Sequence, residues 1–124
     1  MAEHRLARFG IAVAIAGLAA AACTTRLTPI AAIPSPDGSI VADWYRVSGG
    51  TDVRWTAGYV RLRKSADPFV ARNDDVLQLT SDAKLTIVWK SNTQLEITYP
   101  AGETVARAYP KWNNVAIVYR IGPK

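Results

Sequence analysis

The sequence predicts an all-β domain, and three observations lead to that prediction. From residue 35 onward, apolar residues alternate with polar ones in segments rich in β-branched and aromatic residues. Gly, Pro, Asn and Asp bound these segments, as they do in turns. No segment of this region repeats its apolar residues at the roughly 3.6-residue period of a helix. We therefore expect one small antiparallel sandwich, or a partly open barrel, of about six to seven strands.

The turns define the expected strands. Ser-Pro-Asp-Gly at 35–38 predicts a turn, since Pro36 fixes φ and Gly38 accepts a positive φ. Gly49-Gly50 predicts a hairpin loop, and Lys64 to Asp75 predicts a long loop. The expected strands cover residues 39–47, 53–64, 76–80, 85–90, 95–99, 104–109 and 115–121.

The first 22 residues have the three zones of a secretory signal peptide. Arg5 and Arg8 give a positive start, residues 9–18 are apolar, and residues 19–22 are small. The apolar run ends at Ala22 and is shorter than the roughly 20 residues that a transmembrane helix needs. We expect residues 1–22 to form a signal helix that is removed, and not a permanent anchor.

The chain's only cysteine, Cys23, follows these small residues. The segment Ala20-Ala21-Ala22-Cys23 resembles the lipobox of bacterial lipoproteins. The resemblance implies that the Cys23 thiol carries diacylglycerol, that the chain is cut before Cys23, and that the new amine is acylated. It also implies a lipid anchor in the cell envelope, and Thr24 in place of Asp favours the outer membrane, facing the periplasm. The alternative is an ordinary signal-peptidase site in the same alanines, with plain secretion to the periplasm.

Residues 23–36 are expected to form the lipidated cysteine and a tether that precede a β domain over 37–124. Thr24 to Pro36 contains three prolines and no alternating pattern, which is typical of an extended linker. Fully stretched, such a segment reaches roughly 45 Å, enough to hold the domain clear of a membrane. The alternative is that Ile30 to Ile33 lie along the domain.

The composition excludes several kinds of chemistry. His4 and Cys23 are the only histidine and cysteine, so the chain after the leader has no histidine and, once lipidated, no free thiol. This excludes Ser-His-Asp and Cys-His nucleophilic sites, zinc sites built from His or Cys, and disulfides. The formal net charge of +5 is scattered along the chain, so we expect no nucleic-acid partner. We also expect no cofactor and no metal.

Two further resemblances concern the β domain. The segment SPDGSIVADW, residues 35–44, is similar to a motif of periplasmic WD40-like and TolB-type repeats, but a propeller needs several copies. More broadly, the sequence resembles a group of small uncharacterised bacterial proteins. That group has no assigned activity, so the resemblance implies a fold and no catalytic residue. The matching residues are the SPDG turn, Gly49-Gly50, Trp89, Ser91 and Leu95-Glu96-Ile97.

The second expected strand carries the first candidate interaction face. Val60 and Leu62 should be buried on one side of it, because side chains alternate along a strand. The other side forms what we call the aromatic–basic stripe, which could bind an anionic polymer or a protein by stacking and charge; an ordinary sheet face is the alternative. Trp112, in an expected exposed loop, is a second candidate. The stripe consists of Trp55, Tyr59, Arg61 and Arg63.

Other residues receive structural interpretations. Trp89 and Tyr99 alternate in phase with aliphatic residues and are expected in the core. Asp74 and Asp75 are interpreted as a solvated turn, and Glu96 as a residue on the exposed face of its hairpin.

These observations favour a lipid-anchored envelope protein that is a non-catalytic interaction or assembly module, not an enzyme. Its partners would be the membrane and an envelope protein or cell-wall polymer. The alternative is a small carboxylate-dependent hydrolase or inhibitor in the periplasm. A glycoside hydrolase needs two acids in one pocket, roughly 5 Å or 6.5–9.5 Å apart. The candidate acids are Asp43, Asp74, Asp75, Asp82, Glu96 and Glu103.

Overall fold

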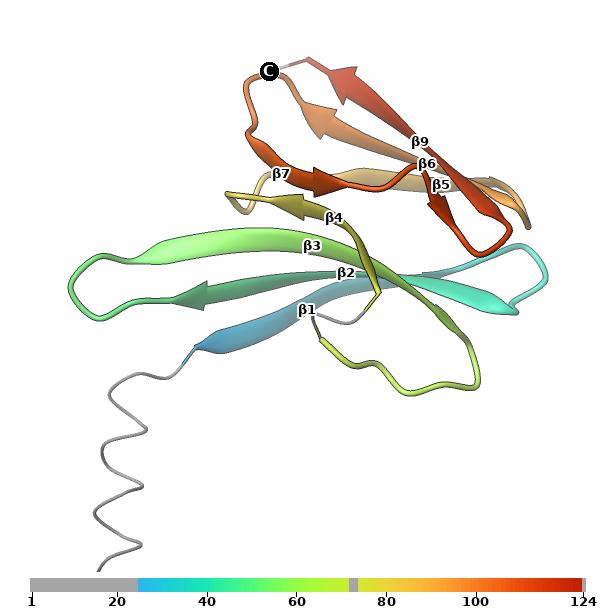
Figure 1. The fold of residues 1–124 in the computed structure, drawn as a ribbon, viewed down its shortest axis with the longest axis horizontal. Helices are drawn as coiled ribbons and strands as arrows, with labels where there is room; N and C mark the ends of the chain where they lie inside the picture. Colours follow the sequence, from blue (N-terminus) through green and yellow to red (C-terminus); the bar gives the residue numbers. More distant parts are fainter. Residues whose placement is uncertain (1–24, 72–73, 124) are drawn as a thin grey trace, which may run out of the picture.

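The computed structural model describes residues 25–71 and 74–123, and these form two β-sheets that face each other (Figure 1). The first sheet has the strand order β1-β2-β3-β4-β7, and the second has the order β5-β6-β9-β8. The strands are β1 Arg26–Pro34, β2 Ile40–Gly49, β3 Trp55–Lys64, β4 Asp75–Leu79, β5 Thr86–Ser91, β6 Gln94–Pro100, β7 Val105–Ala108, β8 Lys111–Trp112 and β9 Val115–Gly122. The expected leader, Cys23 and Thr24 lie outside the described residues.

The expected all-β sandwich is confirmed, and neither sheet closes into a barrel. Two details differ from the expectation: the described residues form nine strands, and β6 pairs with β9 in parallel. The parallel pair arises because the chain leaves the second sheet after β6, adds β7 to the first sheet, and then returns. Such a crossover lets β9 run in the same direction as β6.

The expected tether is wrong for the residues of β1. This strand pairs antiparallel with β2 from Arg26 opposite Ser48 to Pro34 opposite Val41. The prolines fit because β1 is an edge strand, where a missing N–H need not break the ladder, and the register shifts between Pro29 and Ala31. The interpretation that Ile30 to Ile33 lie along the domain is the correct one.

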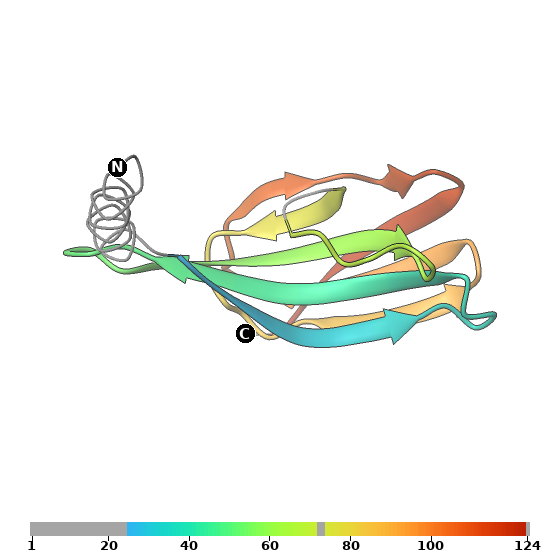
Figure 2. The ribbon, with the colours of Figure 1, turned by 90° about the horizontal axis from the view of Figure 1, so that it is seen from below.

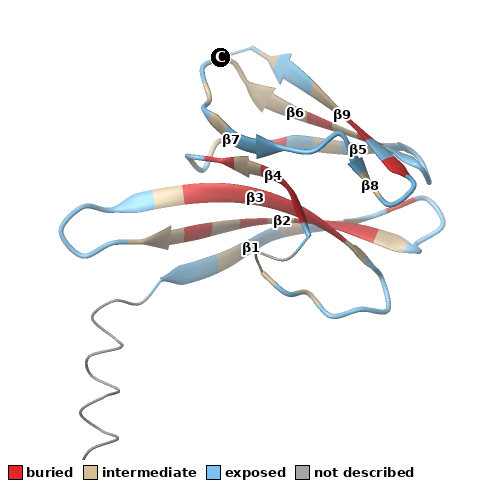
Figure 3. Cartoon of the chain, in the orientation of Figure 1, coloured by how far each residue is buried: buried red, intermediate tan, exposed pale blue. Residues whose placement is uncertain are grey.

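The main core lies between the two sheets. Figure 3 shows the buried residues concentrated on β2, β3 and β4 in the first sheet. Val60 and Leu62 are fully buried, as the alternation predicts. Leu95 and Ile97 meet this face from the second sheet, and Trp44, Trp89, Tyr99 and Trp112 pack around the edges of the same cluster.

Polar contacts at the edges of the core join the two sheets. Trp89 on β5 donates a hydrogen bond from Nε1 to the Ile33 carbonyl on β1, at 2.9 Å. The phenol of Tyr119 on β9 lies 2.9 Å from the Val76 carbonyl on β4 and 2.7 Å from the Tyr109 carbonyl. Burial raises the pKa of the Tyr119 phenol well above its ordinary value.

The expected turn at residues 35–38 is confirmed. Gly38 has φ +76°, and Oδ1 of Asp37 accepts hydrogen bonds from the backbone and hydroxyl of Ser39 and from the hydroxyl of Ser35. These bonds, the one from the Ser39 backbone first, lower the pKa of Asp37. The Asp37 N–H in turn donates to the side chain of Asn92, which lies between β5 and β6. The turn therefore connects the two sheets at this end.

The β2–β3 hairpin extends beyond the second sheet at the other end of the molecule (Figure 2). Gly49 pairs with Trp55 at its last rung, and Gly50 has φ +101°. A Cβ at Gly50 would lie 1.9 Å from the Val53 carbonyl oxygen, so only glycine fits there. Because Arg26 pairs with Ser48, β1 begins beside this projecting end.

Candidate functional site

The aromatic–basic stripe lies on the outer face of the first sheet, which we define as the face turned away from the second sheet. Its four residues do share one face, as expected. They do not form an open surface, however, because Tyr59 and Arg61 are each only 3% exposed. Trp55, at the hairpin end of β3, is the exposed member at 41%. The expectation of a continuous exposed stripe is therefore wrong.

A second, smaller core covers the middle of this outer face. The rings of Tyr45 and Tyr59 stack with centroids 5.1 Å apart and planes 12° apart. Phe69, from the loop after β3, packs edge-on against Tyr45 at 5.1 Å and 80°. Val47 and Ala57 complete the buried group. The loop residues 65–71 thus fold back over side chains that the sequence pattern had placed on a free face.

Arg61 holds this loop in place. Its Nη1 donates a hydrogen bond of 2.7 Å to the Val70 carbonyl, and its guanidinium carbon lies 5.7 Å from the centre of the Phe69 ring. Its Nε is buried without a hydrogen-bond partner among the described residues. A cation used in this way cannot also contact a polymer at the surface, so we assign Arg61 a structural role.

Arg63 also makes contacts within the domain. It donates from Nε to Oδ2 of Asp43 at 2.7 Å, and from Nη1 to the Asp67 carbonyl at 2.8 Å. Asp43 is buried beside it on β2. The pair joins β2, β3 and the start of the loop, so Arg63 is likewise part of the support of the outer face.

Asp75 is buried on β4, and the expectation that it lies in a solvated turn is wrong. The Tyr45 hydroxyl donates a hydrogen bond of 2.7 Å to Oδ1 of Asp75. Asp74, its neighbour, is exposed and has φ +60°. The backbone turns at Asp74, and this allows Asp75 to enter the strand facing Tyr45.

A shallow cavity of about 350 Å³ lies next to this small core. Residues Pro29 to Ala32 of β1 form one wall, and Asp43, Tyr45 and Phe69 contribute to the rest. The lining offers one carboxylate, and that carboxylate is already paired with Arg63. The lining of the cavity is therefore mainly apolar, and its one carboxylate is used in an ion pair within the domain.

The six candidate acids do not converge in the cavities of the described residues. Of these acids, only Asp43 lines one of the four most pronounced cavities of the described residues. Glu96, on the outer face of the second sheet, accepts a hydrogen bond of 2.7 Å from Arg120, which together with Lys90 lowers its pKa. Glu103 accepts a hydrogen bond from the hydroxyl of Ser81. These cavities offer no acid pair for the hydrolase alternative, and the described residues contain no metal-binding group of three or more His, Cys, Asp or Glu.

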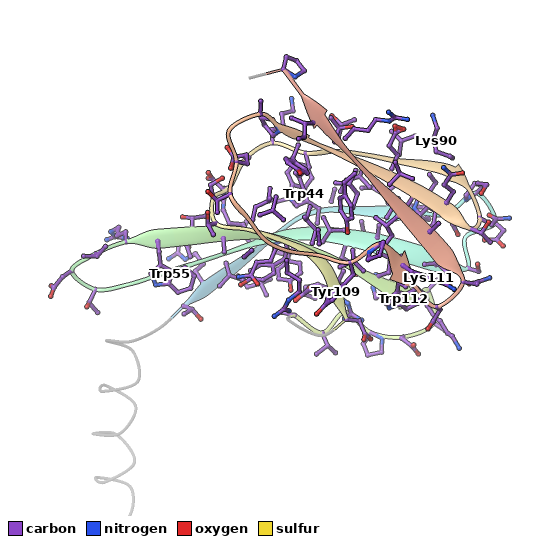
Figure 4. The ribbon with its side chains drawn as sticks, turned by 45° about the horizontal axis from the view of Figure 1, so that its top comes forward. Trp44, Trp55, Lys90, Tyr109, Lys111 and Trp112 are labelled. Carbon is purple, nitrogen blue, oxygen red and sulfur yellow. The ribbon has the colours of Figure 1, made fainter. Side chains whose placement is uncertain are left out.

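The expectation that Trp112 lies in an exposed loop is wrong. Trp112 belongs to the short strand β8, where it pairs with Val115, and it packs half-buried against the main core. Figure 4 shows Lys111 and Trp112 in one region of the domain, away from Trp55. The ring of Tyr109 is half exposed and lies 5.9 Å from the guanidinium carbon of Arg107.

A basic hollow lies at the projecting end of the β2–β3 hairpin. This cavity of about 360 Å³ is lined by Arg26, Arg54 and Trp55, together with the backbone around Gly49 and Gly50. Sequence reasoning identified Trp55 and missed both arginines. Arg26 was assigned to the tether, and its position beside the hairpin depends on the pairing of β1 with β2.

Comparison of the chain with protein-family models, with curated proteins and with solved structures finds no match. Residues 25–71 and 74–123 include no helix with the length and apolarity needed to cross a membrane.

Proposed function

We propose that this chain is a lipid-anchored protein of the bacterial cell envelope, and that its β domain is a non-catalytic interaction or assembly module. The observation that carries the proposal is the position of Cys23. It is the only cysteine, and it ends a run of small residues that follows a positive start and an apolar segment. Only Thr24 and Thr25 separate it from the first residue of β1.

The chemistry of the anchor follows from the small residues and the thiol. Cleavage before Cys23 frees an amine, and the thiol and the amine together accept more than one acyl chain. One chain of myristoyl length binds a membrane only marginally, so several chains are needed for stable attachment. Thr24, in place of Asp, favours the outer membrane with the domain in the periplasm.

The use of the acidic side chains supports a non-catalytic role. Asp43 is bonded to Arg63, Asp75 to Tyr45, and Glu96 to Arg120. Each of these acids therefore stabilises the fold by a contact within the domain. The class of partner that suits the module is an envelope protein or an anionic cell-wall polymer, because 13 Lys and Arg against 9 Asp and Glu remain once residues 1–22 are removed, a formal net charge of +4.

The anchor is tested on the full chain expressed in a bacterial host. The wild-type protein should partition into the detergent phase, and mass spectrometry of its N-terminal peptide should show acyl chains on Cys23. Cys23→Ser should abolish both results. Full-length protein that keeps its leader, or a Ser variant that stays in the membrane, would overturn the lipid anchor.

The interaction role is tested separately by cross-linking in native membranes. The wild-type protein should give a reproducible cross-link to one envelope protein or to the cell-wall polymer, and Cys23→Ser should weaken it by removing the protein from the membrane. The same cross-linking on purified protein in lipid vesicles is the control. If native membranes give no product beyond this control, the module role is wrong even where the anchor is real.

A further inference from the structure

The end of the first sheet at which β1 begins carries an exposed apolar and basic surface. Val53, in the hairpin loop, is 78% exposed, and Trp55 and Leu27 are also exposed. Two arginines complete this end: Arg26, opposite Ser48, points to the other face of β1 from Leu27, and Arg54 directly precedes β3. We call this surface the hairpin end, and it consists of Arg26, Leu27, Val53, Arg54 and Trp55.

The strand register brings the two apolar strand residues together on the outer face. Leu27 is opposite Val47 on β2, and Trp55 is opposite Gly49, two residues further along β2. Side chains two residues apart on a strand point to the same face, so Leu27 and Trp55 occupy neighbouring rows. A Cβ at Gly49 would lie 2.7 Å from Cζ2 of Trp55, so the absence of a side chain there lets the indole lie across the strand.

The arginines of the hairpin end are available for an external anion. Among the described residues, neither Arg26 nor Arg54 has an ion-pair partner, whereas Arg46, Arg63 and Arg120 each have one. Arg26 and Arg54 line the same cavity as Trp55. The loop also contains Asp52, which leaves the hairpin end with a net positive charge.

We propose that the hairpin end is a membrane-contacting surface, which lies in the headgroup layer of the anionic bilayer to which Cys23 is attached. This inference rests on the proposed lipid anchor. Acyl chains on Cys23 would place that residue at the headgroups, and Arg26 is three Cα steps away, at most about 11 Å. The surface potential of a membrane falls off over a Debye length of about 8 Å. Because β1 begins at Arg26, no long tether lets the domain move away.

The side chains of the hairpin end suit this environment. Trp is enriched where a membrane meets water, because its ring is apolar and its N–H is polar. Val53 and Leu27 would bury apolar surface there, and Arg26 and Arg54 would bind lipid phosphates. The hairpin projects past the second sheet in both ribbon views, so the second sheet does not prevent it from reaching a flat surface (Figures 1 and 2).

Depth-dependent quenching of tryptophan fluorescence tests the proposal. Full-length lipidated protein is reconstituted into vesicles of phosphatidylethanolamine and phosphatidylglycerol, with or without lipids brominated on their acyl chains. Wild-type emission should be quenched by the brominated lipids, and Trp55→Phe should remove most of that quenching. The double variant Arg26→Glu/Arg54→Glu, which keeps Trp55, should also lose most of it.

Matched variants away from the hairpin end are the controls. Trp112→Phe removes a different tryptophan, and Arg107→Glu/Lys111→Glu reverses two charges on β7 and β8; both should keep the wild-type quenching. Thermal melts of every variant show whether it is folded. If Trp55→Phe is quenched like the wild type, or if the brominated lipids do not quench the wild-type protein, membrane contact by the hairpin end is overturned.

The mass of the N-terminal peptide separates this failure from failure of the anchor. Acylated Cys23 without quenching of Trp55 would leave the anchor in place and reject only the contact surface. Cys23 without acyl chains would overturn the anchor, and Arg26 would then no longer be held within reach of the headgroups.

Discussion

Arg63 donates a hydrogen bond of 2.7 Å from its Nε to Oδ2 of Asp43, and the two side chains are only 17% and 8% exposed. The same domain contains a much more exposed pair, Arg46 and Asp82, whose closest atoms are 3.4 Å apart and whose side chains are 37% and 56% exposed. The two pairs connect the same types of side chain. They therefore form a matched comparison of a buried and an exposed ion pair.

Asp43→Asn should lower the free energy of unfolding by about 1–3 kcal/mol, since it leaves a largely buried guanidinium without its charged partner. Asp82→Asn should cost less than about 1 kcal/mol, because exposed ion pairs are weak. Urea denaturation of both variants measures the difference. Equal losses for the two variants would show that the buried pair does not support the outer face.

Trp89 should be essential for joining the two sheets. Trp89→Ala should cost about 2–4 kcal/mol, somewhat less than a fully buried aromatic residue, because Trp89 is partly buried against the core. Trp89→Phe keeps much of the packing and removes the hydrogen bond to Ile33, so it should cost about 1 kcal/mol and speed hydrogen exchange of the β1 amides. Val88→Ala, at an exposed neighbouring position, is the control. A loss below about 1 kcal/mol for Trp89→Ala would place Trp89 outside the core.

Tyr119 should make stability depend on pH in the alkaline range. Its folded-state pKa lies above the ordinary value of about 10, so the folded protein keeps a proton that the unfolded chain loses. The contribution of Tyr119 to the free energy of unfolding should be complete below about pH 10 and should decrease as the pH rises further.

Tyr119→Phe isolates this effect. The variant should be less stable than the wild type by about 1 kcal/mol at neutral pH, because the contacts to Val76 and Tyr109 are lost. The difference between the two proteins should shrink above about pH 10, whatever the other groups do. Urea titrations at several pH values measure it. A difference that stays constant to high pH would contradict the role assigned to the buried phenol.

Phe69 should hold the loop that covers the outer face. Phe69→Ala removes its contacts with Tyr45 and Arg61, and we expect a loss of about 1–3 kcal/mol because the ring is only partly buried. Amides of residues 65–71 should then exchange faster, while those of β6 and β9 should change little. Val70→Ala, with an exposed side chain, is the matched control. Unchanged exchange in the loop would mean that Arg61 alone holds it.

Features that depend only on residues close together along the chain were predictable from the sequence. The alternation along 53–64 correctly separated Val60 and Leu62 from the stripe, because successive side chains of a strand point to opposite faces. The turn at 35–38 was predictable for the same reason, since the preferences of Pro36 and Gly38 are properties of their own backbones.

The tertiary structure decided which of these faces is covered. Alternation shows that Tyr59 and Arg61 share a face, but it cannot show that Phe69, from a loop without a periodic pattern, folds over them. The pairing of β1 with β2 and the parallel pairing of β6 with β9 also join segments that lie apart in the sequence. The sequence by itself thus determined seven of the nine strands of the described residues, the turn at 35–38 and which side chains of a strand share a face, but not β1 or β8. Contacts between distant segments decided that most of the aromatic–basic stripe is covered by the loop and that Arg26 lines a cavity with Trp55. The physical reason is that the burial of a strand face depends on what packs against it, and the alternation of residues along the strand does not contain that information.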